Sequence, residues 1–163
     1  MTIPGLSLVP LTPEMASQRW LSWFRDPAIK EFIIAKPKTV AALRKAAKAW
    51  RADRRVLALA IMVGEQHIGN VKLVLPRPLG DTVEIGLLLA PEPQGRGIGP
   101  EVIRQAVVVA LRVWPRVNKV VAGIFPENVA SLSAFKRAGF ALTGLDRIWA
   151  VWPKPKKKIR RVR

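Results

Sequence analysis

A glycine-rich heptapeptide constrains the fold of this 163-residue chain more than any other segment. The heptapeptide, Gln94-Gly95-Arg96-Gly97-Ile98-Gly99-Pro100, stands between an apolar run at residues 83–89 and a helical pattern of apolar residues over 101–113. Glycines in such a turn let the main chain approach a ligand closely, and the free amides together with the helix dipole favour phosphate. No Gly-Lys-Ser/Thr ends the segment, and its glycines are too close together for a dinucleotide fingerprint. The segment therefore predicts either a phosphate-binding turn or a plain glycine-rich turn.

The order of the predicted elements indicates one mixed α/β domain over residues 1–163. Strands are expected at residues 6–11, 56–63, 68–75, 83–89 and 119–125, and from 141 onward. Helices are expected after Thr12, from Asp26-Pro27 to residue 33, and over 40–54, 101–113 and 131–138. Residues 64–67 join two of the strands in a hairpin, which makes His67 a turn residue. No internal repeat and no linker divides the chain.

Missing residue types exclude several kinds of site. The chain has no cysteine, which excludes disulfides, thiolate metal sites and a cysteine nucleophile. It has one histidine and no tyrosine, so we expect neither a multi-histidine metal centre nor a phenolic acid catalyst. No apolar run approaches the roughly 20 residues that cross a bilayer. The first residues also lack a basic segment that leads into an apolar one, so we expect a cytoplasmic protein without a secretory signal.

Positive charge is the second compositional constraint. The chain has 28 Lys and Arg residues against 11 Asp and Glu residues, a net charge of +17. Residues 154–163 contain seven cations and no acid. The excess favours an anionic partner, such as a phosphorylated cofactor, RNA, a ribosome or an acidic membrane surface. The same ten residues could instead form the charged edge strand of a hairpin that begins at residues 148–152.

Three stretches of the sequence resemble the GNAT superfamily of N-acetyltransferases. Gln94-x-x-Gly97-x-Gly99 is similar to its acetyl-coenzyme A signature. Asn128-x-x-Ser131, then Phe135 and residues 138–140, are similar to its closing motif. The opening, from residues 11–13 through 23 to 26–27, resembles the branch that acetylates ribosomal-protein N-termini. The resemblance covers roughly residues 6–145 and implies one domain, in which a mixed, mostly antiparallel sheet has splayed central strands and flanking helices.

The resemblance also implies where acetyl-coenzyme A binds. Gln94 would order the turn, Arg96 would add a charge near a phosphate, and the amides of Gly95, Gly97, Ile98 and Gly99 would hold the pyrophosphate. The pantetheine arm would pair with the strand edge formed by Leu88, Leu89 and Ala90. Asn128 would position the cofactor or a water molecule. Phe135 stands where many relatives have the tyrosine that serves the leaving thiolate.

Three residues are the candidate catalytic groups: Ser131, Glu84 and Asn128. Direct attack of an amine on a thioester needs a base for the amine and a hydrogen-bond donor for the leaving thiolate. Ser131 is the available hydroxyl, although it could instead cap the helix at 131–138. Glu84 interrupts an apolar strand and is the candidate base, although it could be an edge-facing, solvated carboxylate. Some relatives carry a glutamate where this chain has Gly123, and Glu127 and Asp81 are weaker alternatives.

Two functions follow from these patterns. The first is acetyl-coenzyme A dependent N-acetyl transfer to a protein N-terminus, a lysine or a small amine, without a metal. The second is a GNAT-fold module with weak catalysis that binds an anionic partner, such as RNA or a ribosome. The glycine-rich turn favours the first function, whereas the missing tyrosine and the charge of +17 favour the second. The chain is expected to be a monomer or a homodimer.

Overall fold

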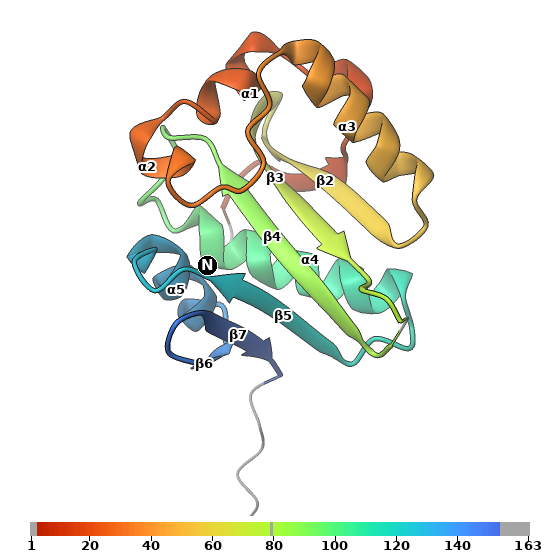
Figure 1. The fold of residues 1–163 in the computed structure, drawn as a ribbon, viewed down its shortest axis with the longest axis vertical. Coiled ribbons are helices and arrows are strands. Elements are labelled where there is room, and N and C mark those ends of the chain that lie inside the picture. The colour runs from red at the N-terminus through yellow and green to blue at the C-terminus, as the bar shows by residue number, and fades with distance from the viewer. Residues whose placement is uncertain (1–2, 79, 154–163) are drawn as a thin grey trace, which may run out of the picture.

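The fold is built on one seven-stranded sheet with the strand order β1-β2-β3-β4-β5-β7-β6 (Figure 1). The structure, a computed structural model, describes residues 3–78 and 80–153. The strands are β1 (Leu6–Pro10), β2 (Val56–Val63), β3 (Gln66–Val74), β4 (Thr82–Leu89), β5 (Lys119–Ile124), β6 (Ala141–Thr143) and β7 (Ile148–Trp152). The α-helices are α1 (Gln18–Trp23), α2 (Pro27–Lys30), α3 (Val40–Ala52), α4 (Ile98–Val113) and α5 (Val129–Arg137). A short 3-10 helix, Pro13–Met15, precedes α1.

The two central strands of the sheet, β4 and β5, part from each other. They form its parallel pair, whereas the other neighbouring strands are antiparallel. The parallel pairing begins at Thr82 and ends where Glu84 lies opposite Val121. β4 stays paired with β3 as far as Leu89. Beyond Glu84, the other edge of β4 is no longer paired with β5. The two strands diverge toward the side of the molecule where α2 and α5 lie (Figure 1). The expected splayed pair is therefore confirmed.

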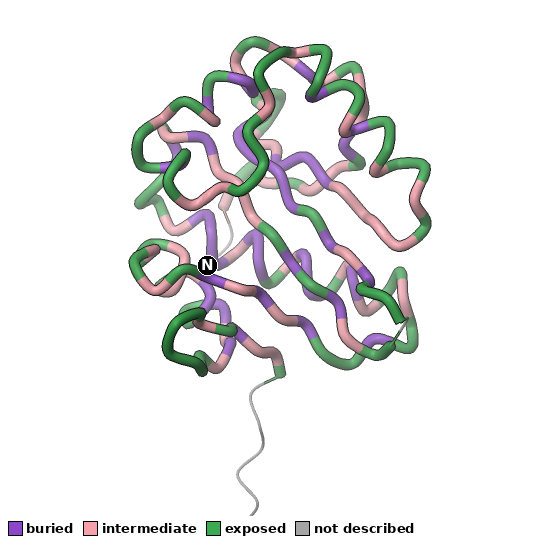
Figure 2. The backbone as a smooth tube through the Cα atoms, in the orientation of Figure 1, coloured by how far each residue is buried: buried purple, intermediate pink, exposed green. Residues whose placement is uncertain are grey.

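Helices cover both faces of the sheet and enclose two cores. α4 and α5 contribute to one core with Val83 and Ile85 of β4, and α1 and α3 contribute to the other, against which Leu88 packs. Because side chains alternate along a strand, Glu84 and Gly86 share the face of Leu88. Both are exposed, so the helices of this second face leave the middle of β4 open. Figure 2 shows the buried residues concentrated in the sheet and along α4.

The main departure from the predicted elements lies before α1. Thr12 does not cap an α-helix, because the 3-10 helix follows it and α1 begins only after Ser17. The Ser17 hydroxyl oxygen accepts a hydrogen bond from the Trp20 N–H at 3.1 Å and so takes the capping role. Asp26 caps α2 as predicted, but that helix ends at Lys30 rather than at residue 33.

The C-terminal hairpin also differs from the predicted one. β7 pairs with β6 on one side and β5 on the other, so the hairpin spans residues 141–152. Residues 154–163, predicted to be a basic strand or tail, lie outside the described residues. Within residues 3–78 and 80–153, no helix is both long and apolar enough to cross a membrane.

Candidate active site

The glycine-rich turn adopts a backbone that only glycine enters readily. Gly95 has φ +79°, and Gly97, the N-cap of α4, has φ +74°. L-residues rarely adopt these values, whereas glycine adopts them without a steric penalty. A Cβ built on either residue would meet no heavy atom within 4 Å. The turn is therefore glycine-rich for conformational reasons, and the space beside it is open to a ligand. Arg96 lies exposed between the two glycines.

The first turn of α4 has N–H groups available to an anion. Ile98 and Gly99 are its first two residues, so their N–H groups have no carbonyl one turn earlier in the helix. Glu101 adds an acid to this turn, but its carboxylate accepts hydrogen bonds from Gln105 at 3.1 Å and from Arg104 at 2.9 Å. These hydrogen bonds lower the pKa of Glu101, and the bond from Gln105 has the largest effect. Because Arg104 offsets the carboxylate charge, the helix N-terminus still suits a phosphate.

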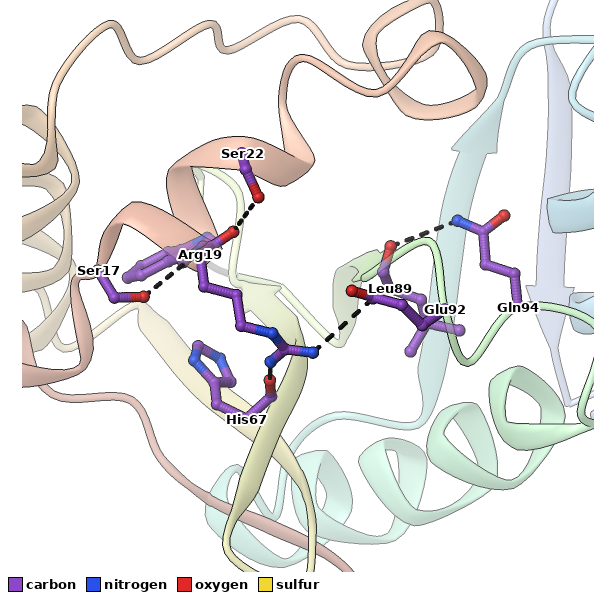
Figure 3. Close-up of polar contacts among 8 residues, drawn as sticks. Ser17, Arg19, Ser22, His67, Leu89, Glu92 and Gln94 are labelled. Carbon is purple, nitrogen blue, oxygen red and sulfur yellow. Dashed lines mark hydrogen bonds and ion pairs between the residues drawn. The ribbon is translucent and has the colours of Figure 1, made fainter.

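Two contacts connect this turn with the other predicted motifs. The Gln94 side-chain amide donates to the Leu89 carbonyl oxygen at 3.4 Å, which connects the turn to the end of β4 (Figure 3). A Cβ built on Gly99 would lie 3.3 Å from the Cβ of Ala134 in α5. The absence of a side chain at Gly99 thus lets the start of α4 pack against α5. The structure thereby brings together the glycine-rich turn and the helix of the closing motif.

The edge of β4 that faces the gap runs beside this turn. The Ala90 N–H donates to the Ile68 carbonyl at 2.8 Å and so points toward β3. Because hydrogen-bonding groups alternate along a strand, the groups of Leu88 also face β3, and those of Leu87 and Leu89 face the gap. Sequence reasoning named Leu88, Leu89 and Ala90 and missed Leu87. The register with β3, which no sequence pattern predicts, decides which backbone groups face the gap.

Asn128 and Ser131 lie together at the start of α5. Asn128 is the N-cap, and its Oδ1 accepts a hydrogen bond from the Ser131 N–H at 3.1 Å. The alternative role of Ser131 as the helix cap is therefore wrong, since Asn128 fills that position. Ser131 lies half-buried in the first turn, and its hydroxyl has no hydrogen-bond partner among the described side chains and backbone. The hydroxyl is thus available to a ligand.

Phe135, expected beside the cofactor, lies in the core. Its side chain is 2% exposed, and its ring packs edge-on against Phe140 with 5.1 Å between the ring centroids. A ring buried in this way presents almost no surface to a ligand. We therefore leave Phe135 out of the proposed cofactor site.

Glu84 lies where β4 and β5 part. It is exposed and belongs to the last residue pair between the two strands. β4 is a central strand flanked by β3 and β5, so Glu84 does not lie at an edge of the sheet, but its exposure agrees with the solvated carboxylate of the alternative interpretation. Its carboxylate instead stands at the closed end of the gap, on the face that α1–α3 leave open.

The two weaker acid candidates lie elsewhere. Asp81 precedes β4, at the end where the strands are still paired, and its carboxylate accepts a hydrogen bond from the Thr82 hydroxyl at 3.0 Å. Hydrogen bonds lower the pKa of Asp81, and the bond from Thr82 has the largest effect. Glu127 is exposed in the turn between β5 and α5. Neither residue stands at the point where the gap opens, so Glu84 remains the candidate base.

His67 lies in β3 and not in the predicted turn. Its ring meets Trp23 edge-on at 5.1 Å and Trp20 at 5.7 Å between centroids. Its Nε2 lies 2.8 Å from the side-chain amide of Asn70. With the Asn70 amide nitrogen directed at His67, the amide oxygen accepts from the Trp20 indole N–H at 2.9 Å. Burial is the main reason that the pKa of His67 is lowered.

Arg19 connects this aromatic cluster to the turn after β4. Its guanidinium donates a hydrogen bond to the His67 carbonyl oxygen and lies 3.7 Å from the Glu92 carboxylate (Figure 3). Sequence reasoning missed these contacts, because residues far apart in the chain make them. They connect α1, β3 and the segment that leads into the glycine-rich turn.

Comparison with known proteins decides the family. The sequence pattern of the GNAT acetyltransferase domain matches residues 6–141. The chain belongs to the GNAT acetyltransferase family. No curated protein sequence matches it. Within the described residues, no group of three or more histidine, cysteine or acidic side chains could hold a metal ion.

Solved structures share the fold of this GNAT protein. Aminoglycoside acetyltransferase AAC(6′)-Ib in complex with coenzyme A has a TM-score of 0.75 and 22% identity, over 90% of this chain and 93% of that chain. Ribosomal-protein-S5-alanine acetyltransferase from Vibrio fischeri has a TM-score of 0.76 and 14% identity, over 93% and 94% of the two chains. An acetyltransferase from Thermus thermophilus has a TM-score of 0.70 and 24% identity, over 93% and 98%.

Family membership confirms the predicted fold, activity class and acyl donor. This GNAT protein is an N-acetyltransferase, and acetyl-coenzyme A is its donor substrate. The open glycine-rich turn, the N–H groups at the start of α4 and the edge of β4 beyond its last residue pair with β5 fit a phosphorylated donor with an extended arm.

Proposed function

We propose that this GNAT protein transfers acetyl from acetyl-coenzyme A to a primary amine by direct attack on the thioester. The amine belongs to a protein N-terminus, a lysine side chain or a small molecule. One observation carries the proposal: the gap between β4 and β5 opens directly beyond an exposed carboxylate, that of Glu84. The donor enters from the glycine-rich turn, and the acceptor reaches the gap from the opposite face.

The main chain binds the donor in this proposal. The pyrophosphate lies on N–H groups of the glycine-rich turn, those of Gly95, Gly97, Ile98 and Gly99. Gln94 holds the turn against β4 through its bond to the Leu89 carbonyl, and Arg96 adds a positive charge. The arm pairs with the edge of β4 that faces the gap, at Leu87 and Leu89, with Leu88 and Ala90 beside them. Backbone groups that are already ordered bind a flexible donor at a lower entropic cost.

Glu84 and Ser131 complete the reaction. The amine nitrogen forms a bond to the thioester carbonyl carbon, and the carbon–sulfur bond breaks. Glu84 takes a proton from the amine, directly or through a water molecule. The Ser131 hydroxyl donates a hydrogen bond to the leaving thiolate, which takes up a proton from solvent to give free coenzyme A, and Glu84 releases the amine proton to solvent. Asn128 holds the start of α5, and with it Ser131, in place.

The test has two steps. Calorimetry first measures acetyl-coenzyme A binding to the full chain. A pooled set of peptides with free N-termini, lysine peptides and small amines is then incubated with the donor, and mass spectrometry identifies acetylated products. We expect binding and at least one amide product. Binding of the donor without transfer to any amine would contradict the proposal.

A second role rests on charge. The chain carries +17, and residues 154–163 hold seven of its cations. We infer that this segment binds RNA or a ribosome, because such a density of cations exceeds what one coenzyme neutralises. If catalysis proves weak, this binding becomes the principal function.

A further inference from the structure

The guanidinium of Arg147 fills the space that a side chain at position 123 would occupy. A Cβ built on Gly123 would lie 2.5 Å from both Nε and Nη2 of Arg147. The guanidinium carbon also lies 5.3 Å from the ring centroid of Trp149, which is the residue paired with Gly123 across β5 and β7. A glycine and an aromatic ring thus hold the guanidinium against the sheet. Arg147 nevertheless remains exposed.

The turn that carries Arg147 requires a glycine. Gly144 follows β6 and has φ +108°, and a Cβ built on it would collide with the Arg147 carbonyl oxygen. Any other residue at position 144 would therefore displace the backbone of Arg147. The chain thus specifies where the guanidinium lies through two glycines, one in the turn and one in the neighbouring strand.

Arg147 lies on the same face of the sheet as Glu84. Val121 is the partner of Glu84 on β5, and Gly123 lies two residues further along that strand, with its side-chain direction on the same face. Two residues of strand span roughly 6–7 Å. The guanidinium over Gly123 therefore stands at least two residues of extended peptide from the proposed base, in the direction in which the gap opens.

Further cations border this face. A pocket with a volume of about 410 Å³ is lined by Phe24, Arg25, Lys30, Lys36, Pro37 and Lys38. The same segment reaches β5, since the ring of Phe32 lies 6.4 Å from that of Phe125, which follows the strand. The segment that carries these cations therefore packs beside the end of β5.

Few acids offset these cations. Asp26 and Glu31 belong to the same segment, and the Asp26 carboxylate already accepts the capping hydrogen bond of α2. Asp146 precedes Arg147 and is exposed. None of the ion pairs among the described residues involves Arg147 or the cations of the pocket. Ion pairs among the described residues therefore neutralise neither Arg147 nor the cations of the pocket.

We propose that the acceptor carries a carboxylate close to its reactive amine, as an acidic peptide N-terminus does, and that Arg147 binds that carboxylate. This inference rests on the proposed amine acetylation. A planar guanidinium that is already held in place binds a carboxylate with two parallel hydrogen bonds. The cations of the pocket bind acidic residues further along an extended peptide. Polycationic amines are repelled by the same charges, so the surface selects against them.

The test compares acceptors that differ in charge. Three peptides share an N-terminal alanine and continue with two aspartates, two serines or two lysines, and spermidine and kanamycin serve as polycationic small amines. The kcat/KM of each is measured with the wild-type chain, Arg147→Ala and Arg147→Lys. Arg112→Ala is the matched control, because Arg112 is also exposed but belongs to the last turn of α4, on the other face. Calorimetry with the N-acetylated aspartate peptide and coenzyme A gives a readout that needs no turnover.

We expect the wild-type chain to prefer the aspartate peptide over the serine peptide by about tenfold, and to use the lysine peptide and the polyamines least. Arg147→Ala should bring the aspartate-to-serine ratio close to one, Arg147→Lys should restore part of it, and Arg112→Ala should leave it unchanged. Acetylation of the peptides without a charge preference, or best turnover of spermidine or kanamycin, would overturn this inference while leaving amine acetylation intact. Arg147-dependent binding of the acetylated aspartate peptide without turnover of any amine would support the site and contradict the proposed function.

Discussion

Glu84 and Val121 form the last residue pair that joins β4 to β5, and the gap between the strands opens directly beyond them. The exposed carboxylate of Glu84 therefore stands at the closed end of the gap, while the glycine-rich turn lies beyond the open end of β4. This relationship places the proposed base and the proposed donor site at the two ends of one strand segment. The predictions below test the parts of this arrangement separately.

Replacing Gly97 with valine should abolish acetyl-coenzyme A binding. The substitution forces a β-branched residue into φ +74° and places a side chain in the open space beside the turn. Gly64→Val is the matched control, because Gly64 has φ +59° and equally open surroundings but lies in the β2–β3 turn. Calorimetry should show lost binding for the first variant alone. If a folded Gly97→Val protein bound acetyl-coenzyme A with the wild-type affinity, the donor would not bind at this turn.

Ser131→Ala should lower turnover by about 10²-fold with little change in donor affinity. The loss is expected because the thiolate would leave without its hydrogen-bond donor. Stability should change little, since Asn128 and not Ser131 caps α5. Ser133→Ala, an exposed position on the same helix, is the control. Steady-state kinetics and thermal unfolding separate the two roles, and unchanged kcat in Ser131→Ala would show that the hydroxyl takes no part in the reaction.

Part of this arrangement was predictable because local patterns specify it. The glycines of residues 94–99 signal a turn before a helix, and the cap-then-proline pair Asp26-Pro27 signals the start of α2. Alternation along β4 places Glu84 opposite the buried side chains. Periodicity could not distinguish Thr12 from Ser17 as the cap of α1, because both are good capping residues before a helical pattern.

The rest depends on contacts between distant parts of the chain. His67 was predicted in a turn, but β3 begins at Gln66 and places the half-buried ring against tryptophans of α1. The position of Arg147 over Gly123 follows from the pairing of β5 with β7, which no local pattern specifies. Only the register of β3 against β4 identifies Leu87 as a residue whose backbone faces the gap.

His67 should make the fold less stable as the pH falls from 7 to 5. Burial lowers the pKa of His67 in the folded chain below the ordinary value of 6.5. As the pH falls, His67 therefore becomes protonated in the unfolded chain before it becomes protonated in the folded chain. The free energy of unfolding therefore falls as the pH drops below 6.5, until the folded ring also becomes protonated. Urea unfolding at several pH values should show this slope in the wild-type chain and a flatter one in His67→Gln. Identical slopes would contradict burial as the cause.

Neutralising the C-terminal cations should weaken binding to RNA or ribosomes and reduce its salt dependence, because fewer counterions are released. The variant replaces Lys156, Lys157, Lys158, Arg160 and Arg161 with glutamine. Affinity for acetyl-coenzyme A should stay nearly unchanged, since the proposed donor site does not include this segment. Filter binding across a salt series is the measurement. Absence of RNA or ribosome binding by the wild-type chain at low salt would refute this partner.

The rate of acetyl transfer by Glu84→Gln tests the central claim most directly. The carboxylate at the closed end of the gap accepts the amine proton, so replacing it with an amide should slow acetyl transfer. Glu84→Gln should bind acetyl-coenzyme A normally and turn over about 10²-fold more slowly. Glu127→Gln, which changes an exposed acid in the turn before α5, should keep the wild-type rate. An unchanged kcat/KM in Glu84→Gln would contradict the account.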